Sequence, residues 1–177
     1  SMDILISSNL ERLLYLVSGD CELVASLMQQ LKTDGFYTVP AELLEKIQSR
    51  FWAGCCGDEA TEETIRDVWE RHSYLCDTHT AVAWNVAQQY EKAAESPAPM
   101  VVLSTASPYK FPAAVLSAIG AKCDGDEFDM MSVLEKATGV AIPANLRSLR
   151  ERPVLHTGCV KPGKMRGYVL DLLEGKT

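Results

Sequence analysis

Two hydroxyl side chains, Ser104 and Thr105, directly follow an apolar run and are the residues of this chain best placed to bind a ligand. The run, Met100 to Leu103, is short and rich in β-branched residues, which is typical of a strand buried on both faces. Such strands form parallel sheets, whose ligands bind beyond the carboxyl ends of the strands. A hydroxyl there can contact a ligand, or it can satisfy turn and capping groups.

A second polar pair, His79 and Thr80, stands at the expected start of a long helix over residues 77–94, where Asp77 and Thr78 are available as caps. The first N–H groups of a helix have no partner within it, and such an end favours an anion. His79 and Thr80 are therefore candidates to contact a substrate carboxylate or phosphate. Helix capping and packing are the alternative.

The cysteine and acidic residues do not follow a metal-site pattern. The six cysteines include no C-x-x-C pair and no histidine at zinc-finger spacing. The acidic turn at residues 124–127 lacks the remaining ligands of a calcium loop. We therefore expect no metal, and we expect reduced thiols in a cytoplasmic protein, with Cys55 and Cys56 as the pair that could be reactive.

Composition excludes two classes of partner. The 177 residues are 47% hydrophobic and 23% charged, as in a globular domain long enough to bury a core. The net charge of −7, without a basic cluster, argues against nucleic acid. No apolar run approaches the roughly 20 residues of a membrane span, so we expect no membrane partner.

Helices dominate the elements that the sequence predicts. Gly19 is expected to end a first helix, Asp20 to cap the second, and Thr61 to cap a later one. Short strands are expected at residues 36–39, 100–103 and 154–157. We expect residues 1–19 and 73–177 to form part of an α/β domain, with residues 20–72 as a helical insertion.

Three motifs, in order along the chain, resemble threonine synthases of the bacterial and fungal branch. Residues 103–112, Leu-Ser-Thr-Ala-Ser-Pro-Tyr-Lys-Phe-Pro, are similar to the family's Leu-Ser/Ala-Thr-Ala-x-Pro-x-Lys-Phe-Pro pattern. Residues 74–83 resemble its Tyr-x-x-Asp-Pro-His-Thr-Ala-Val-Gly, and residues 1–14 its Ser-Met-Asp-Ile-x-x-Ser-Ser-Asn-Phe-Glu-Arg-Leu-Leu. Ser107 stands where many relatives carry histidine, and Thr78 where they usually carry proline.

The resemblance implies an α/β fold: the helix-rich C-terminal portion of a pyridoxal-phosphate enzyme of fold type II, like the tryptophan synthase β subunit, with few parallel strands. It implies conversion of O-phosphohomoserine and water to threonine and phosphate, with pyridoxal phosphate as cofactor. By the match, Thr105 would face the pyridine nitrogen with Ser104 beside it. His79 and Thr80 would be weaker candidates for contact with the substrate.

Two elements of the family have no counterpart in these residues: the Schiff-base lysine and the Ser-Gly-Asn-Phe-Gly phosphate loop, both in its N-terminal half. Lys110 is therefore expected to be a surface charge. We expect a C-terminal fragment with no catalytic residue of its own, inactive alone and partnered by the missing N-terminal half. A non-catalytic threonine-synthase-like interaction module and one half of a split enzyme are the alternatives.

Overall fold

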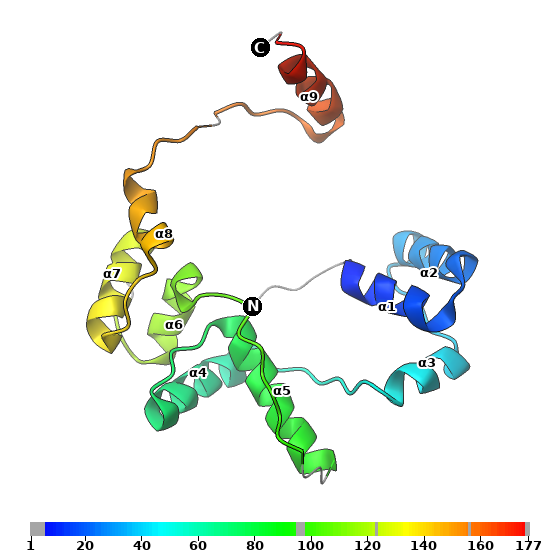
Figure 1. The fold of residues 1–177 in the computed structure, drawn as a ribbon, viewed down its shortest axis with the longest axis horizontal. Coiled ribbons are helices and arrows are strands. Elements are labelled where there is room, and N and C mark those ends of the chain that lie inside the picture. The colour runs from blue at the N-terminus through cyan, green and yellow to red at the C-terminus, as the bar shows by residue number, and fades with distance from the viewer. Residues whose placement is uncertain (1–5, 95–97, 123, 156, 176–177) are drawn as a thin grey trace. The chain divides into compact units, whose positions relative to one another are not determined.

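The computed structural model describes residues 6–94, 98–122, 124–155 and 157–175. Helices are the regular elements of these residues (Figure 1). Ser1–Ile4 of the first family motif, Cys123 and His156 lie outside the described residues. The chain divides into two compact units, Ser1–Ile142 and Pro143–Thr177, and each is described by itself below.

The first three helices pack around a small apolar core. They are α1 (Ser8–Ser18), α2 (Cys21–Asp34) and α3 (Ala41–Gln48), and α1 packs against both others (Figure 1). Gly19 ends α1 at a φ of 68°, and the Asp20 side chain accepts from the first N–H groups of α2, so both local predictions are confirmed. The buried side chains of this cluster are Leu14, Val24, Leu27 and Leu43.

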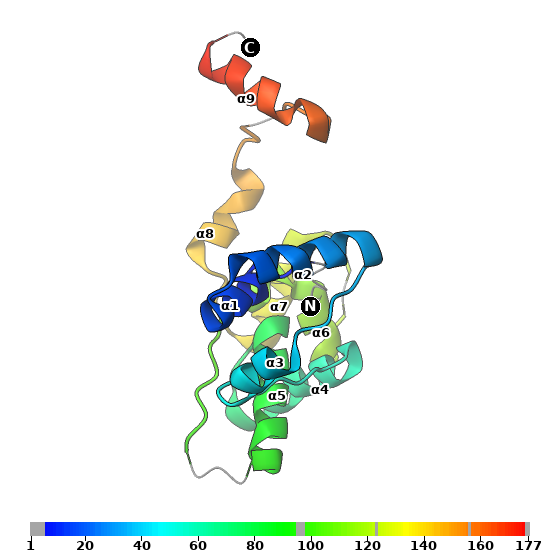
Figure 2. The same cartoon turned by 90° about the vertical axis from the view of Figure 1, so that its right-hand side faces the viewer.

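A second group of helices surrounds the predicted site. Helix α4 (Asp58–His72) packs against α5 (Thr78–Ala94) and α6 (Pro112–Ala118), and α6 packs against α7 (Glu127–Thr138), as Figure 2 shows from the side. The core of this group consists of fully buried or nearly buried side chains: Ile65, Val68, Val115, Leu116 and Leu134.

The start of α4 differs from the sequence prediction. Thr61 is not the cap, because α4 begins at Asp58 with Gly57 in the capping position. Thr61 lies inside the first turn, and its hydroxyl donates to the Gly57 carbonyl across 2.8 Å. The acidic residues Asp58 and Glu59 stabilise the first turn of α4, because negative charge stabilises a helix N-terminus.

The side chain of Arg66, on α4, caps the C-terminal end of α6. The Nε of Arg66 donates to the carbonyl oxygen of Ala118 across 2.8 Å. The last carbonyls of a helix lack partners within it, and a cation there also opposes the negative end of the helix dipole. This contact fixes α6, and therefore the loop that precedes it, against α4.

The strands expected at residues 36–39, 100–103 and 154–157 are not formed among the described residues. At 100–103 the expectation of burial also fails, because Val101 is 78% exposed and Leu103 is 72% exposed. A strand is stable only when a neighbour accepts and donates its backbone hydrogen bonds. The described residues offer no such neighbour here, so this stretch stays an irregular connection between α5 and the loop before α6.

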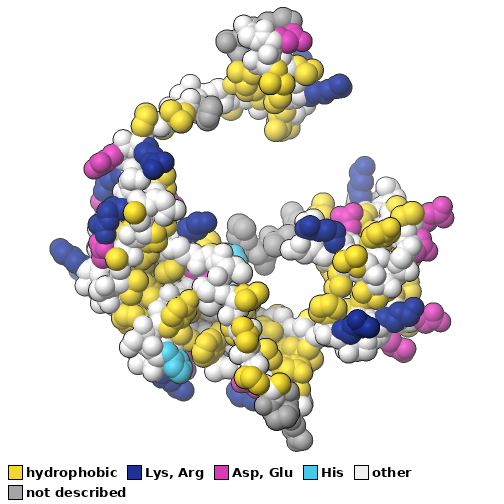
Figure 3. All heavy atoms as spheres, in the orientation of Figure 1, with side chains coloured by type: hydrophobic (Ala, Val, Ile, Leu, Met, Phe, Trp, Pro, Cys, Tyr) yellow, Lys and Arg dark blue, Asp and Glu magenta, His cyan; other side chains and the backbone are white. Residues whose placement is uncertain are grey.

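The unit Pro143–Thr177 contains short helices: α8 (Ala144–Arg147), the 3-10 turns η2 (Ser148–Glu151) and η3 (Pro162–Lys164), and α9 (Met165–Leu173). No residue of α9 is buried, and hydrophobic side chains reach its surface in Figure 3. Among the described residues, no helix has the length and apolarity that crossing a membrane requires. The expected division into residues 1–19 and 73–177 with an insertion at 20–72 stays a prediction.

Candidate functional site

Asp77 is the centre of the polar cluster at the start of α5. Its side chain is fully buried, and one carboxylate oxygen accepts from the backbone N–H of His79 across 2.9 Å and of Thr80 across 3.4 Å. Asp77 is thus the N-cap of α5. Its other oxygen accepts the hydroxyl hydrogen of Thr80. The predicted capping role of Asp77 is confirmed, and the aspartate takes the N–H groups that an external anion would otherwise use.

The ring of His79 is held between Asp77 and Phe111. Its Nδ1 lies 3.2 Å from Oδ1 of Asp77, and its centroid lies 5.1 Å from that of the Phe111 ring, with the planes tilted by 50°. The side chain of His79 is 35% exposed. A ring nitrogen in this position can donate its hydrogen to the carboxylate of Asp77.

Ser104 joins this cluster from the loop before α6. Its Oγ lies 3.3 Å from Oγ1 of Thr80, which is 24 positions earlier in the chain. The Tyr74 hydroxyl donates to the same Oγ across 3.0 Å. The structure therefore brings together three of the predicted site residues, Ser104, His79 and Thr80, around the carboxylate of Asp77.

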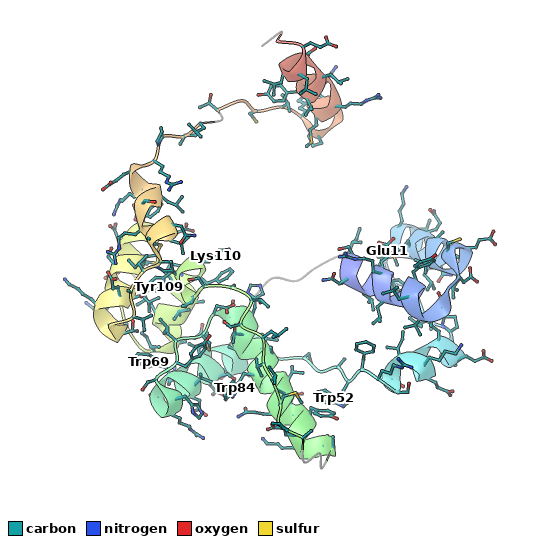
Figure 4. All side chains as sticks on the ribbon, in the orientation of Figure 1. Glu11, Trp52, Trp69, Trp84, Tyr109 and Lys110 are labelled. Atoms are coloured by element: carbon teal, nitrogen blue, oxygen red, sulfur yellow. The ribbon has the colours of Figure 1, made fainter. Side chains whose placement is uncertain are left out.

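Thr105, the fourth predicted site residue, is exposed, and its hydroxyl has no hydrogen-bond partner among the described residues. The loop that follows is fixed. Ser107 caps a 3-10 turn by accepting from the N–H of Tyr109 across 3.3 Å, and the hydroxyl of Tyr109 donates to the carbonyl of Val140 after α7. Figure 4 labels Tyr109 and its neighbour Lys110, whose side chain is exposed.

Cys76 lies directly before Asp77 and is 1% exposed. Burial, and then the nearby charge of Asp77, raise the pKa of this thiol to about 11. Cys76 is therefore a neutral packing group at physiological pH rather than a nucleophile.

Surface grooves lie elsewhere in this unit, and two of them are lined by residues of α5. One of about 590 Å³ is lined by residues 48–52, 100–102 and one face of α5, where the Trp52 and Tyr90 rings are 5.6 Å apart. Trp52 is labelled in Figure 4. Another of about 380 Å³ lies between α4 and α5 and includes the Arg71–Asp67 ion pair. Neither groove is lined by Ser104, Thr105 or His79.

Comparison with known proteins finds a similarity to threonine synthases. The model of the family "Threonine synthase, C-terminal" matches residues 80–157, which include Thr80, Ser104 and Thr105. The threonine synthase of Pseudomonas aeruginosa is 38% identical over 116 residues, which are 65% of this chain and 24% of that protein. That of Saccharomyces cerevisiae is 37% identical over 135 residues, 67% of this chain and 26% of that protein. The chain is therefore similar to the C-terminal part of threonine synthases.

A solved structure supports the same assignment at the level of fold. The threonine synthase of Brucella melitensis, described as bound to PLP, superposes with a TM-score of 0.65 and 38% identity. The match covers 86% of this chain and 29% of that one. The helix-rich architecture expected from the resemblance is therefore confirmed. The chain spans about a quarter of the length of the curated relatives cited above.

The two departures from the threonine synthase motifs have local explanations. Ser107 replaces a histidine, and its hydroxyl caps the 3-10 turn, a role for which serine is well suited. Thr78 replaces a proline at the first position of α5, where it is buried. The Asp77 N-cap forms without the fixed φ of a proline at that position.

Sequence reasoning missed Tyr74 and the central role of Asp77. Both lie in the motif at residues 74–83, and Asp77 was identified only as an available cap. A cap is a local feature, whereas complete burial and the link to Ser104 depend on a segment more than twenty positions away. No periodicity or spacing in the sequence signals that contact.

Proposed function

We propose that these residues are the C-terminal part of a threonine synthase that converts O-phosphohomoserine and water to threonine and phosphate. The observation that carries the proposal is the pair Ser104 and Thr105, which follow the family pattern and differ in their contacts. Ser104 is held in the cluster around Asp77, and Thr105 keeps an exposed hydroxyl without a partner among the described residues.

The donor chemistry of Thr105 fits pyridoxal phosphate. A neutral hydroxyl can donate to an unprotonated pyridine nitrogen, whereas an aspartate there would keep that nitrogen protonated. When bound, the cofactor supplies the electron sink for the reaction. In this proposal Thr105 would hold the ring nitrogen and Ser104 would fix the backbone beside it. The lysine and the phosphate loop that complete the cofactor site belong to the N-terminal half expected as partner.

Substrate contact at α5 is proposed for His79 more than for Thr80. Thr80 is 3% exposed, and its hydroxyl already donates to Asp77 and Ser104. The backbone N–H groups of both residues are also taken by Asp77. What remains is the partly exposed ring of His79, whose Nε2 can accept a hydrogen bond from the substrate or from a protonated phosphate oxygen.

The chain alone is proposed to be inactive, because no Schiff-base lysine of the family pattern was found in it. Its partners would be O-phosphohomoserine and the N-terminal half, and not nucleic acid or a membrane. The cysteine usage supports a cytoplasmic location.

The first test is the mass and visible absorbance of the protein purified from its own cells. A larger, yellow protein that forms threonine and phosphate from O-phosphohomoserine is the expected result. A colourless protein of this length without turnover would overturn the proposal in favour of an interaction module, and two separate chains that are active together would indicate a split enzyme. Turnover by the 177-residue chain alone would contradict its proposed inactivity.

The second test compares three substitutions in the complete enzyme. Thr105→Asp is expected to lower kcat more than Ser104→Ala, because only the aspartate changes the protonation of the ring nitrogen. Thr105→Ser keeps a hydroxyl and is the matched control, with activity close to wild type. Equal and small effects of Thr105→Asp and Ser104→Ala would remove Thr105 from the cofactor site.

A further inference from the structure

The hydroxyl groups at the site form a connected network. The hydroxyl of Thr80 donates to the carboxylate of Asp77. It also donates to Ser104 Oγ across 3.3 Å, so its hydrogen is shared between the two oxygens. Ser104 Oγ accepts from Tyr74 as well, across 3.0 Å. Contacts between hydroxyl and carboxylate oxygens thus link Tyr74, Ser104, Thr80 and Asp77.

Asp77 anchors one end of this network. It is fully buried and is also held by two backbone N–H groups, so its position is set by α5 itself. Thr80 is also buried, and in such a position a broken hydrogen bond leaves an unpaired group. The buried pair Asp77 and Thr80 thus holds the exposed Ser104.

We propose that Asp77 is a positioning residue for the cofactor site, acting through Thr80 and Ser104 on the backbone of Thr105. This inference rests on the function proposed above and assigns separate roles to the two neighbouring hydroxyls. The oxygen of Ser104 accepts from Thr80 and Tyr74, so Ser104 holds the turn in place. The hydroxyl of Thr105 stays free to donate to the ring nitrogen.

The test uses Thr80, because changing the buried Asp77 also removes the cap of α5. Thr80→Val keeps the shape of the side chain and deletes the hydroxyl, which interrupts the network between Asp77 and Ser104. Thr80→Ser keeps the hydroxyl and is the conservative rescue. Thr33→Val is the matched control, since the hydroxyl of Thr33 bonds only to carbonyls of its own exposed helix turn.

The first readout is the NMR spectrum of the 177-residue chain. In the wild type we expect a slowly exchanging hydroxyl proton at Thr80, because a hydroxyl that donates to a buried carboxylate is protected from solvent. Thr80→Val should shift the backbone amide resonances of Ser104 and Thr105, whereas Thr80→Ser and Thr33→Val should leave them in place. Unchanged resonances in Thr80→Val would overturn the proposal, whatever the enzyme's activity.

The second readout is steady-state kinetics of the complete enzyme. Loss of one positioning hydrogen bond is expected to lower kcat by about fivefold to tenfold in Thr80→Val, with little change in KM for O-phosphohomoserine. Thr80→Ser should restore kcat. A normal kcat in Thr80→Val would overturn the positioning role. A wild-type enzyme without threonine formation would overturn the proposed function instead, and the NMR comparison would still decide whether the network exists.

Discussion

The hydroxyl of Tyr74 donates to Oγ of Ser104 across 3.0 Å, although the two residues are 30 positions apart and both are exposed. Tyr74 precedes α5, and Ser104 follows the stretch that connects α5 to α6. The contact therefore closes the loop that contains all of α5. Ser104 Oγ thus accepts from both Tyr74 and Thr80.

Tyr74→Phe should have a small effect on stability. The hydrogen bond is exposed, so its loss should lower the free energy of unfolding by only about 0.5 kcal/mol. Urea unfolding followed by circular dichroism measures this change. Tyr15→Phe is the control, because Tyr15 is half-exposed on α1 outside the cluster. A loss several times larger would show that Tyr74 contributes to packing beyond its hydroxyl.

Leu116→Ala should strongly destabilise the helices around the site. Leu116 is fully buried on α6, and truncation of a buried leucine costs about 2–5 kcal/mol of unfolding free energy. Leu16→Ala on α1 removes the same atoms from a side chain that is 77% exposed and should cost less than about 0.5 kcal/mol. Chemical denaturation of both variants gives the comparison, and equal losses would contradict the observed packing of α6.

Asp77→Ala should cost more than Asp20→Ala, although both remove a helix N-cap. Loss of the exposed Asp20 cap is expected to cost about 1 kcal/mol. Asp77 additionally binds Thr80 and His79 in a fully buried position, so its removal leaves buried partners unsatisfied and should cost about 2–3 kcal/mol more. Unfolding free energies of the two variants test this. Equal losses would show that Asp77 contributes to stability only as a helix N-cap.

Cys76 should make stability depend on pH in the alkaline range. The folded state raises the pKa of its thiol from 9.0 to about 11, so the folded protein binds this proton more tightly than the unfolded chain. The contribution is complete below pH 9 and is lost as the pH rises toward about 11, with a limit of about 3 kcal/mol. Cys76→Ala should remove that slope from unfolding measured between pH 8 and 11. A slope unchanged by the substitution would contradict the assignment.

Gly125→Ala should destabilise α7 more than Gly139→Ala does. Both glycines have a positive φ, of 93° and 72°, that costs an alanine energy. At Gly125 an added Cβ would also lie 2.8 Å from side-chain atoms of Asp129, which forms the capping box of α7 with Asp126. At Gly139 the added Cβ would meet nothing within 4 Å. Thermal unfolding should give the larger drop in Tm for Gly125→Ala; the reverse order would contradict the described turn.

Local signals in the sequence predicted the helices well. Gly19 and Asp20 mark a helix end and the next helix start because their effects act within a few residues. The start of α4 was misplaced by one turn, since Thr61 and Gly57 both offer plausible N-cap chemistry. The choice between them depends on how the acidic first turn is completed, which spacing alone does not decide.

Features that depend on distant segments could not be predicted in this way. The apolar run at 100–103 has the composition of a buried strand, but burial requires a covering neighbour that the sequence pattern does not specify. The complete burial of Asp77 and the contact of Ser104 with Thr80 are likewise products of tertiary packing. The family motifs identified these residues, and the structure shows which of them meet.

The stretch at 100–103 carries a consequence for handling the chain in solution. Its backbone N–H and C=O groups are not hydrogen-bonded to any described strand, and the side chains of Val101 and Leu103 are exposed. Such a stretch favours β-sheet association between molecules. The net charge of −7 keeps molecules apart at neutral pH, and that repulsion vanishes near the pI of 5.0. The isolated chain should therefore aggregate fastest in mildly acidic buffer.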